Sequence, residues 1–211
     1  MEQSKKYELL TNDTIELGGG ITLFRIKALI SFGNVEKGEL GGYVEKEDNL
    51  CHSGNAWVTD NARVYGNAKV SDIAEVTGNA KVYDNAKVTG DAWVYGNAKV
   101  SDDAWVSGSA EVYGNAKVTG NAWVTGNAWV YGNARVTGNA KVYDNALVSG
   151  YAKVTDNARV YSNARVFGDA KVYDNAKVTD NALVYGNAKV YGDARVTDNA
   201  WVFDNAKVTG R

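Results

Sequence analysis

The chain has 211 residues, with 23 Lys and Arg against 25 Asp and Glu and a formal net charge of −2. This balance argues against a generally basic nucleic-acid-binding protein, although it leaves room for a local basic stripe. The single cysteine, Cys51, cannot form an internal disulfide, which favours a reducing compartment. The N-terminus has no signal-peptide core and no segment is apolar enough to span a bilayer, so we expect a cytoplasmic protein without a membrane partner.

The first part of the chain lacks the repeat that fills the rest. Residues 7–10 and residues 21–30 are apolar enough for two strands, and glycines 18–20 between them predict a turn. A solenoid needs such a cover over its terminal repeat, because the last coil otherwise exposes its core. We therefore expect a capping segment over residues 1–48 and a repeat domain over residues 49–211.

From residue 55 to residue 210 the hexapeptide Asn-Ala-x-Val-x-(Gly/Asp) occurs twenty-six times without a gap. The second position is always Ala, from Ala56 to Ala206, and the fourth is always Val, from Val58 to Val208. Residues two apart in a strand point the same way, so Ala and Val lie inside while the third and fifth positions point outward. A Gly-Asn or Asp-Asn pair at the sixth and first positions suits a tight bend. Each hexapeptide is then one short strand and one corner.

The number of sides follows from the third positions. Every third hexapeptide belongs to one class, and one class is wholly basic, which chance would produce in roughly one case in a hundred. Its members are Arg63, Lys81, Lys99, Lys117, Arg135, Lys153, Lys171, Lys189 and Lys207. The pattern predicts a three-sided solenoid with coils of eighteen residues, about 8.7 coils in all.

The repeat resembles the left-handed parallel β-helix of hexapeptide-repeat proteins. The N-terminal run Leu-Phe-Arg-Ile-Lys-Ala-Leu at residues 23–29, with residues 32–35 and 38–44, also resembles uncharacterised bacterial YdcK-type proteins of this superfamily. The resemblance implies an all-β, left-handed parallel β-helix with an N-terminal β cap. Its left-handed crossovers depart from the general right-handed rule.

The superfamily includes CoA-dependent acyltransferases, in which a catalytic His acts as general base between subunits of a trimer. Such a His needs an accessible ring. The only histidine here is His52, in the degenerate hexapeptide 49–54, where counting in sixes places it in the inward fourth position. We therefore expect a packing or capping role and no catalytic residue. The γ-carbonic anhydrases of the same fold bind zinc with three His, which one His cannot supply, so we expect no metal site and no cofactor.

The class that begins at Trp57 carries most of the outward apolar residues. Its large apolar members are Trp57, Trp93, Trp129, Leu147, Leu183 and Trp201. One interpretation is ordinary cross-strand stacking. Six large apolar residues in one exposed row nevertheless exceed what a monomer usually shows to water. We expect this row to bind a second copy of the chain or another protein.

The wholly basic class needs its own explanation, because like charges directly opposed on neighbouring strands destabilise a sheet. The favoured interpretation is solubility, with corner carboxylates at Asp84, Asp102, Asp156 and Asp174 partly neutralising the row. The weaker one is a track for a polyanion. A further expectation concerns the last hexapeptide, 205–210, whose uncovered edge predicts pairing between two copies at that end.

Together these features predict a non-catalytic β-helical scaffold or binding protein that acts through outward ladders and self-association. The alternative is a CoA-dependent acyltransferase of the hexapeptide class. The near-identity of the repeats favours the first, because an active site requires local departures from the consensus.

Overall fold

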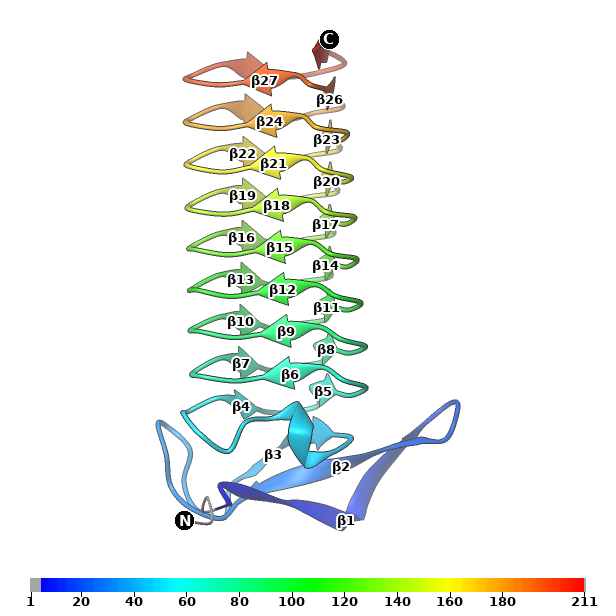
Figure 1. Cartoon of the computed structure of the whole chain (residues 1–211), viewed down its shortest axis with the longest axis vertical. Coiled ribbons are helices and arrows are strands. Elements are labelled where there is room, and N and C mark those ends of the chain that lie inside the picture. Colours follow the sequence, from blue (N-terminus) through cyan, green and yellow to red (C-terminus); the bar gives the residue numbers. More distant parts are fainter. Residues whose placement is uncertain (1–4, 211) are drawn as a thin grey trace.

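The computed structural model describes residues 5–210. It is a straight three-sided parallel β-solenoid of about nine coils, with a β cap at its N-terminal end (Figure 1). Strands one coil apart pair in parallel at a spacing of eighteen residues, as in Trp93↔Glu111, Lys99↔Lys117 and Trp105↔Trp123. The predicted all-β solenoid, its three sides and its eighteen-residue coil are confirmed. The left-handed course stays a prediction.

We name the three sheets by their outward residues. The aromatic sheet contains β4 (Trp57–Val58), β7 (Glu75–Val76), β10 (Trp93–Val94), β13 (Glu111–Val112), β16 (Trp129–Val130), β19 (Leu147–Val148), β22 (Arg165–Val166), β25 (Leu183–Val184) and β28 (Trp201–Val202). The mixed sheet contains β6 (Lys69–Val70), β9 (Lys87–Val88), β12 (Trp105–Val106), β15 (Trp123–Val124), β18 (Lys141–Val142), β21 (Arg159–Val160), β24 (Lys177–Val178) and β27 (Arg195–Val196).

The basic sheet is the longest, because three strands of the cap extend it. Its solenoid strands are β5 (Arg63–Val64), β8 (Lys81–Val82), β11 (Lys99–Val100), β14 (Lys117–Val118), β17 (Arg135–Val136), β20 (Lys153–Val154), β23 (Lys171–Val172), β26 (Lys189–Gly192) and β29 (Lys207–Gly210).

Two small side chains per hexapeptide fill the core. Every Ala from Ala56 to Ala188 and every Val from Val58 to Val190 is essentially fully buried. Burial weakens only in the last described coil, where Ala200 and Ala206 are exposed. The interior is therefore dry and narrow, and each coil is stabilised mainly by its two neighbours.

The corners explain why the sixth position is Gly or Asp. This residue has positive φ in every hexapeptide except the last, near 70° for most glycines and from 53° to 60° for nine of the ten aspartates. The backbone N–H groups of the first, third and fifth positions donate to carbonyl oxygens of the next coil, but the N–H of the sixth position has no such backbone acceptor. Asp supplies the missing acceptor: Asp102 Oδ2 accepts from Gly120 N–H at 2.9 Å and Asp174 Oδ2 from Gly192 N–H at 3.0 Å. A corner Asp thus ties its coil to the next one.

The cap is a hairpin laid against the first coil. β1 (Tyr7–Leu17) and β2 (Ile21–Ala28) pair antiparallel across the turn at residues 18–20, so both predicted strands are confirmed. The sequence did not predict a third strand, β3 (Leu40–Val44), which pairs antiparallel with β2 and parallel with β5. Parallel strand pairing therefore begins within residues 1–48, the segment that was expected only to cap the solenoid.

Two consecutive glycines let β3 approach the solenoid. A Cβ on Gly41 would lie 2.6 Å from the Val58 carbonyl oxygen, and one on Gly42 would lie 2.7 Å from the Ala62 carbonyl oxygen. Both contacts are with backbone, which cannot move aside as a flexible side chain can. The Gly-Gly pair is therefore a requirement of the junction between cap and solenoid.

The first coil is longer than the others. The 3-10 turn η1 (Glu47–Asn49) leads into Leu50, which forms a parallel bridge to Val70 and so occupies the inward fourth position. Asn55 then resumes the regular pattern by donating its N–H to Asp72 O. The corner between Cys51 and Asn55 consequently holds two extra residues. Counting in sixes had placed His52 in the inward position, and this placement is wrong.

Candidate binding faces

The aromatic sheet exposes large apolar side chains in one row. Trp93, Trp129 and Trp201 keep 45%, 43% and 63% of their surface accessible. Leu147 and Leu183 lie in the same row and are half-buried. The parallel pairing of β10, β13, β16, β19, β22, β25 and β28 aligns these residues one coil apart on one face. The row expected from the sequence is therefore present from β10 onward.

Trp57 does not belong to this exposed row. It is only 2% exposed, because the cap covers it: the Tyr7 ring lies edge-on at 6.2 Å and the Phe32 ring at 5.3 Å. Its indole Nε1 is buried without a hydrogen-bond partner among the described residues. The prediction that Trp57 contributes to an exposed partner face is therefore wrong. This residue anchors the cap instead.

Stacked rings flank the row at the fifth positions. Tyr95, Tyr113 and Tyr131 stack in nearly parallel planes with centroids 4.7 and 4.9 Å apart. Further along, Tyr185 stacks on Phe167 at 5.0 Å and on Phe203 at 5.5 Å. Rings stacked in this way have little conformational freedom, so this face is rigid.

Only three charged side chains interrupt the row, namely Glu75, Glu111 and Arg165. The Tyr95 hydroxyl donates to Glu111 Oε2 at 2.9 Å, and burial followed by this carboxylate raises the pKa of Tyr95. Burial, with a smaller effect from Asp91, raises the pKa of Glu75. Arg165 is exposed and forms no ion pair among residues 5–210. The face is thus mostly apolar, with two acids towards the cap and one base towards the far end.

The basic sheet carries the predicted ladder of nine cations, which the parallel pairs place directly opposite one another from Arg63 to Lys207. Burial, followed by repulsion from Arg63 and Lys99, lowers the pKa of Lys81. Within the described chain no ladder cation lies within 4.0 Å of a carboxylate oxygen. The expected neutralisation by corner aspartates is therefore not found as ion pairs. Asp102 and Asp174 accept backbone N–H groups instead.

A shallow groove follows this ladder over its last coils. It has a volume of ≈ 700 Å³ and runs between the cations and the neighbouring corner. Its lining residues are Arg135, Lys153, Lys171, Lys189, Lys207, Asn133, Tyr151, Asp169, Asn187 and Asn205. One acid among five bases leaves this groove strongly positive.

The mixed sheet also exposes an aromatic pair, which the sequence pattern did not single out. Trp105 and Trp123 are 36% and 40% exposed and pack edge-to-face at 5.3 Å. Lys141 Nζ lies 4.2 Å from the Trp123 ring centroid, and Trp105 Nε1 donates to Thr89 Oγ1 at 3.0 Å. These two rings therefore contact each other and neighbouring side chains of the same chain, and Trp93 on the aromatic sheet makes a similar edge-on contact with Tyr95 at 6.5 Å.

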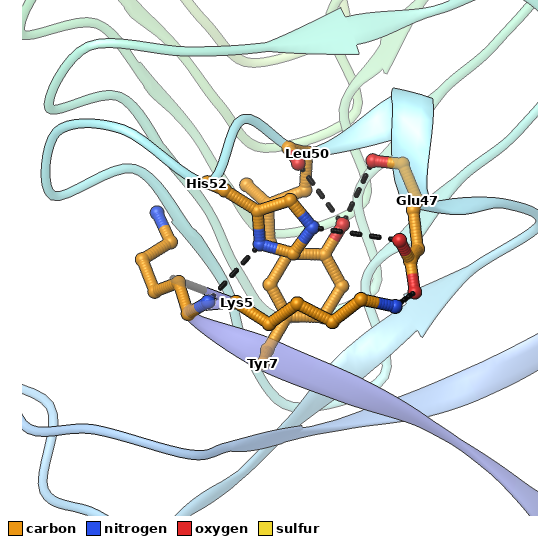
Figure 2. A network of polar contacts seen from close by, with 6 residues as sticks. Lys5, Tyr7, Glu47, Leu50 and His52 are labelled. Atoms are coloured by element: carbon orange, nitrogen blue, oxygen red, sulfur yellow. Dashed lines mark hydrogen bonds and ion pairs between the residues drawn. The ribbon is translucent and has the colours of Figure 1, made fainter. Parts of the chain in front are cut away.

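His52 is packed into the junction between cap and solenoid (Figure 2). Its ring stacks on Tyr7 at 4.5 Å, and its Nδ1 accepts the backbone N–H of Lys6 at 3.1 Å. Nε2 is buried, 3.7 Å from Glu47 Oε2, and the side chain is 19% exposed. Because the ring uses its available lone pair on a backbone N–H, it has none to offer to a substrate.

Lys6 is a buried cation that the sequence analysis missed. Its ammonium donates to Ala56 O at 2.8 Å and Gly54 O at 3.4 Å, and lies 4.7 Å from the Phe32 ring centroid. Burial lowers the pKa of Lys6 to about 8. A lone Lys before an apolar strand carries no sequence signal of burial, because lysines are almost always exposed.

These features define a parallel β-solenoid whose chemistry lies on flat, repeating faces. Residues 128–141 and 188–204 match the family model described as the YdcK beta solenoid repeat, which confirms the resemblance to YdcK-type proteins. The matched residues lie in the repeats, so the likeness of the N-terminal run stays a prediction. A search of curated proteins gives no match. Among the described residues, no helix has the length and apolar character needed to cross a membrane.

Proposed function

We propose that this protein is a non-catalytic β-solenoid scaffold that works by presenting its outward ladders, and that its aromatic sheet associates with a second copy of the chain. The observation that carries this proposal is the row of Trp93, Trp129 and Trp201, each more than two-fifths exposed on one rigid face. Contiguous apolar surface of this kind usually marks a protein interaction site. Aromatic residues are also the side chains most enriched at such interfaces.

Replacing Trp93 and Trp129 together with Lys should convert the associated protein to monomers. Each change puts a hydrated ammonium in the centre of the face, where it would have to be desolvated on association. Light scattering over a range of concentrations should give about twice the mass of one chain for the wild type and the mass of one chain for the variant.

The matched control replaces Trp105 and Trp123 with Lys on the mixed sheet. It makes the same chemical change at two rings of similar exposure, so it tests for a general effect of lost aromatic surface. We expect this variant to keep the wild-type mass. Equal masses for all three proteins at every concentration would contradict self-association through the aromatic sheet.

The alternative, a CoA-dependent acyltransferase, requires His52 to act as a general base. The stacking on Tyr7 and the bond from Lys6 N–H support a structural role for this ring instead. We expect His52→Gln to leave acyl-CoA turnover unchanged, because a Gln amide oxygen can also accept the Lys6 N–H. Thiol release from acetyl-CoA measures this turnover. A robust wild-type activity that disappears in His52→Gln would overturn the non-catalytic proposal.

A further inference from the structure

The charged residues of the aromatic sheet are distributed unevenly along the rod. Glu75 and Glu111 lie on β7 and β13, towards the cap, while Arg165 lies on β22, towards the other end. Glu111 is half-buried and receives one bond, from the Tyr95 hydroxyl to Oε2. Arg165 is exposed and has no ion-pair partner in the described chain. An acid and a base three coils apart, roughly 14 Å, cannot reach each other within one copy.

We infer that two copies pack their aromatic sheets face to face in antiparallel orientation, with the two-fold axis between Trp129 and Leu147. This inference rests on the proposed self-association and specifies its geometry. In an isologous contact, residue i meets residue j of the partner and j meets i. Glu111 then lies opposite Arg165 of the partner subunit, twice in the dimer. Trp129 lies opposite Leu147 of the partner subunit, and Trp93 opposite Leu183 of the partner subunit.

Charge disfavours parallel pairing and antiparallel pairing displaced by one coil towards the far end. A parallel pairing would place Glu111 against Glu111 of the partner subunit and Arg165 against Arg165 of the partner subunit, which is repulsive at both positions. Antiparallel pairing displaced by one coil towards the far end would leave Glu111 against Leu183 of the partner subunit and Arg165 against Trp129 of the partner subunit. Buried without partners, both charges would be costly. The axis between Trp129 and Leu147 avoids both penalties at Glu111 and Arg165, and it leaves only Glu75, at the end of the contact, without a base opposite it.

The cap fits the same arrangement. β28 of the partner faces β7 in this geometry, so no described coil of the partner has to reach Trp57, which the cap covers. Eight coils then face each other over a length of about 38 Å and a width of about 15 Å. Each copy buries on the order of 600 Å², and the total of about 1,200 Å² is at the lower end of the range for stable complexes.

Charge reversal tests the geometry. Glu111→Arg and Arg165→Glu should each raise the dissociation constant at least about tenfold, because each single reversal turns two attractive pairs of the dimer into two repulsive ones. The double variant exchanges the charges and should return to within about threefold of the wild type. Sedimentation equilibrium measures these constants. Glu75→Arg is the matched control, because Glu75 faces Trp201 of the partner subunit and no base, and we expect a change of less than about threefold.

The single cysteine gives a second readout. Nitroxide labels on Cys51, which is partly exposed beside the cap, should lie roughly 45 Å apart along the rod in the antiparallel dimer, since the two caps are then at opposite ends. A parallel dimer would bring the labels much closer together. Double electron–electron resonance distinguishes these distances.

The outcomes separate the two proposals. Monomers for the Trp93 and Trp129 variant, together with charge reversals that leave the dissociation constant unchanged or a short label distance, would overturn the antiparallel geometry and leave self-association standing. A wild type that is monomeric at all concentrations would overturn both.

Discussion

Replacing Val118 with Asp should destabilise the solenoid by on the order of 4 kcal/mol or more. Val118 is fully buried in β14, in the middle of the basic sheet, and the surrounding fourth and second positions are all Val and Ala. A carboxylate there finds no donor, because the neighbouring backbone groups already bond between coils. Burying an ionisable group without a partner is among the few changes that cost this much.

The matched control is Val208→Asp, the same change at the same position of the repeat on the same sheet. Val208 is only half-buried, so its carboxylate can reach water and should cost less than about 1 kcal/mol. Urea unfolding followed by far-ultraviolet circular dichroism gives both values. Equal losses for the two variants would contradict the view that each coil depends mainly on the two coils beside it.

Lys6 should contribute about 2 kcal/mol of additional stability to the wild type as the pH rises from 7 to 9.5. Burial lowers the pKa of Lys6 to about 8, below its value near 10.4 in an unfolded chain. Between these two values the unfolded state binds more protons than the folded state, so the free energy of unfolding increases with pH. Below pH 8 the ammonium is charged in both states, and the full cost of burying it remains.

Lys6→Met removes this titration and keeps an unbranched side chain against Phe32. The increase in unfolding free energy from pH 7 to pH 9.5 should be smaller in this variant by the same amount. The tyrosines are present in both proteins, so their effect on the pH dependence largely cancels in the comparison. Identical pH profiles of unfolding free energy for the two proteins would show that burial does not lower the pKa of Lys6.

The periodicity of the sequence was sufficient for most of the fold. Ala at the second position and Val at the fourth position of each hexapeptide predicted the inward faces. The wholly basic class from Arg63 to Lys207 predicted which strands are neighbours. Such inferences succeed because the same pattern occurs in every hexapeptide, so one that departs from the consensus does not change the prediction. The cap has no such redundancy, and β3 and the close contacts of Gly41 and Gly42 were missed for this reason.

The failures at the candidate sites have the same origin. Trp57 fits the aromatic class by spacing, but its exposure depends on Tyr7 and Phe32, which lie far away in sequence. His52 was placed inward by counting in sixes, whereas two extra residues after Cys51 move Leu50 into that position. Spacing predicts where a side chain points within a regular repeat. It cannot predict what a separate segment places on top of it.

The identical interior of every coil has a consequence for how such a chain can change in length. Duplicating or deleting eighteen residues adds or removes one coil and leaves each outward residue on its original sheet. A change of six residues also preserves the Ala and Val core, yet it moves every later outward residue to the next side, so the basic and aromatic rows would break in two. Both steps keep the buried Ala and Val positions, so we expect both to be compatible with folding. Only the eighteen-residue step also keeps the outward rows intact, so selection for those rows would favour changes by whole coils.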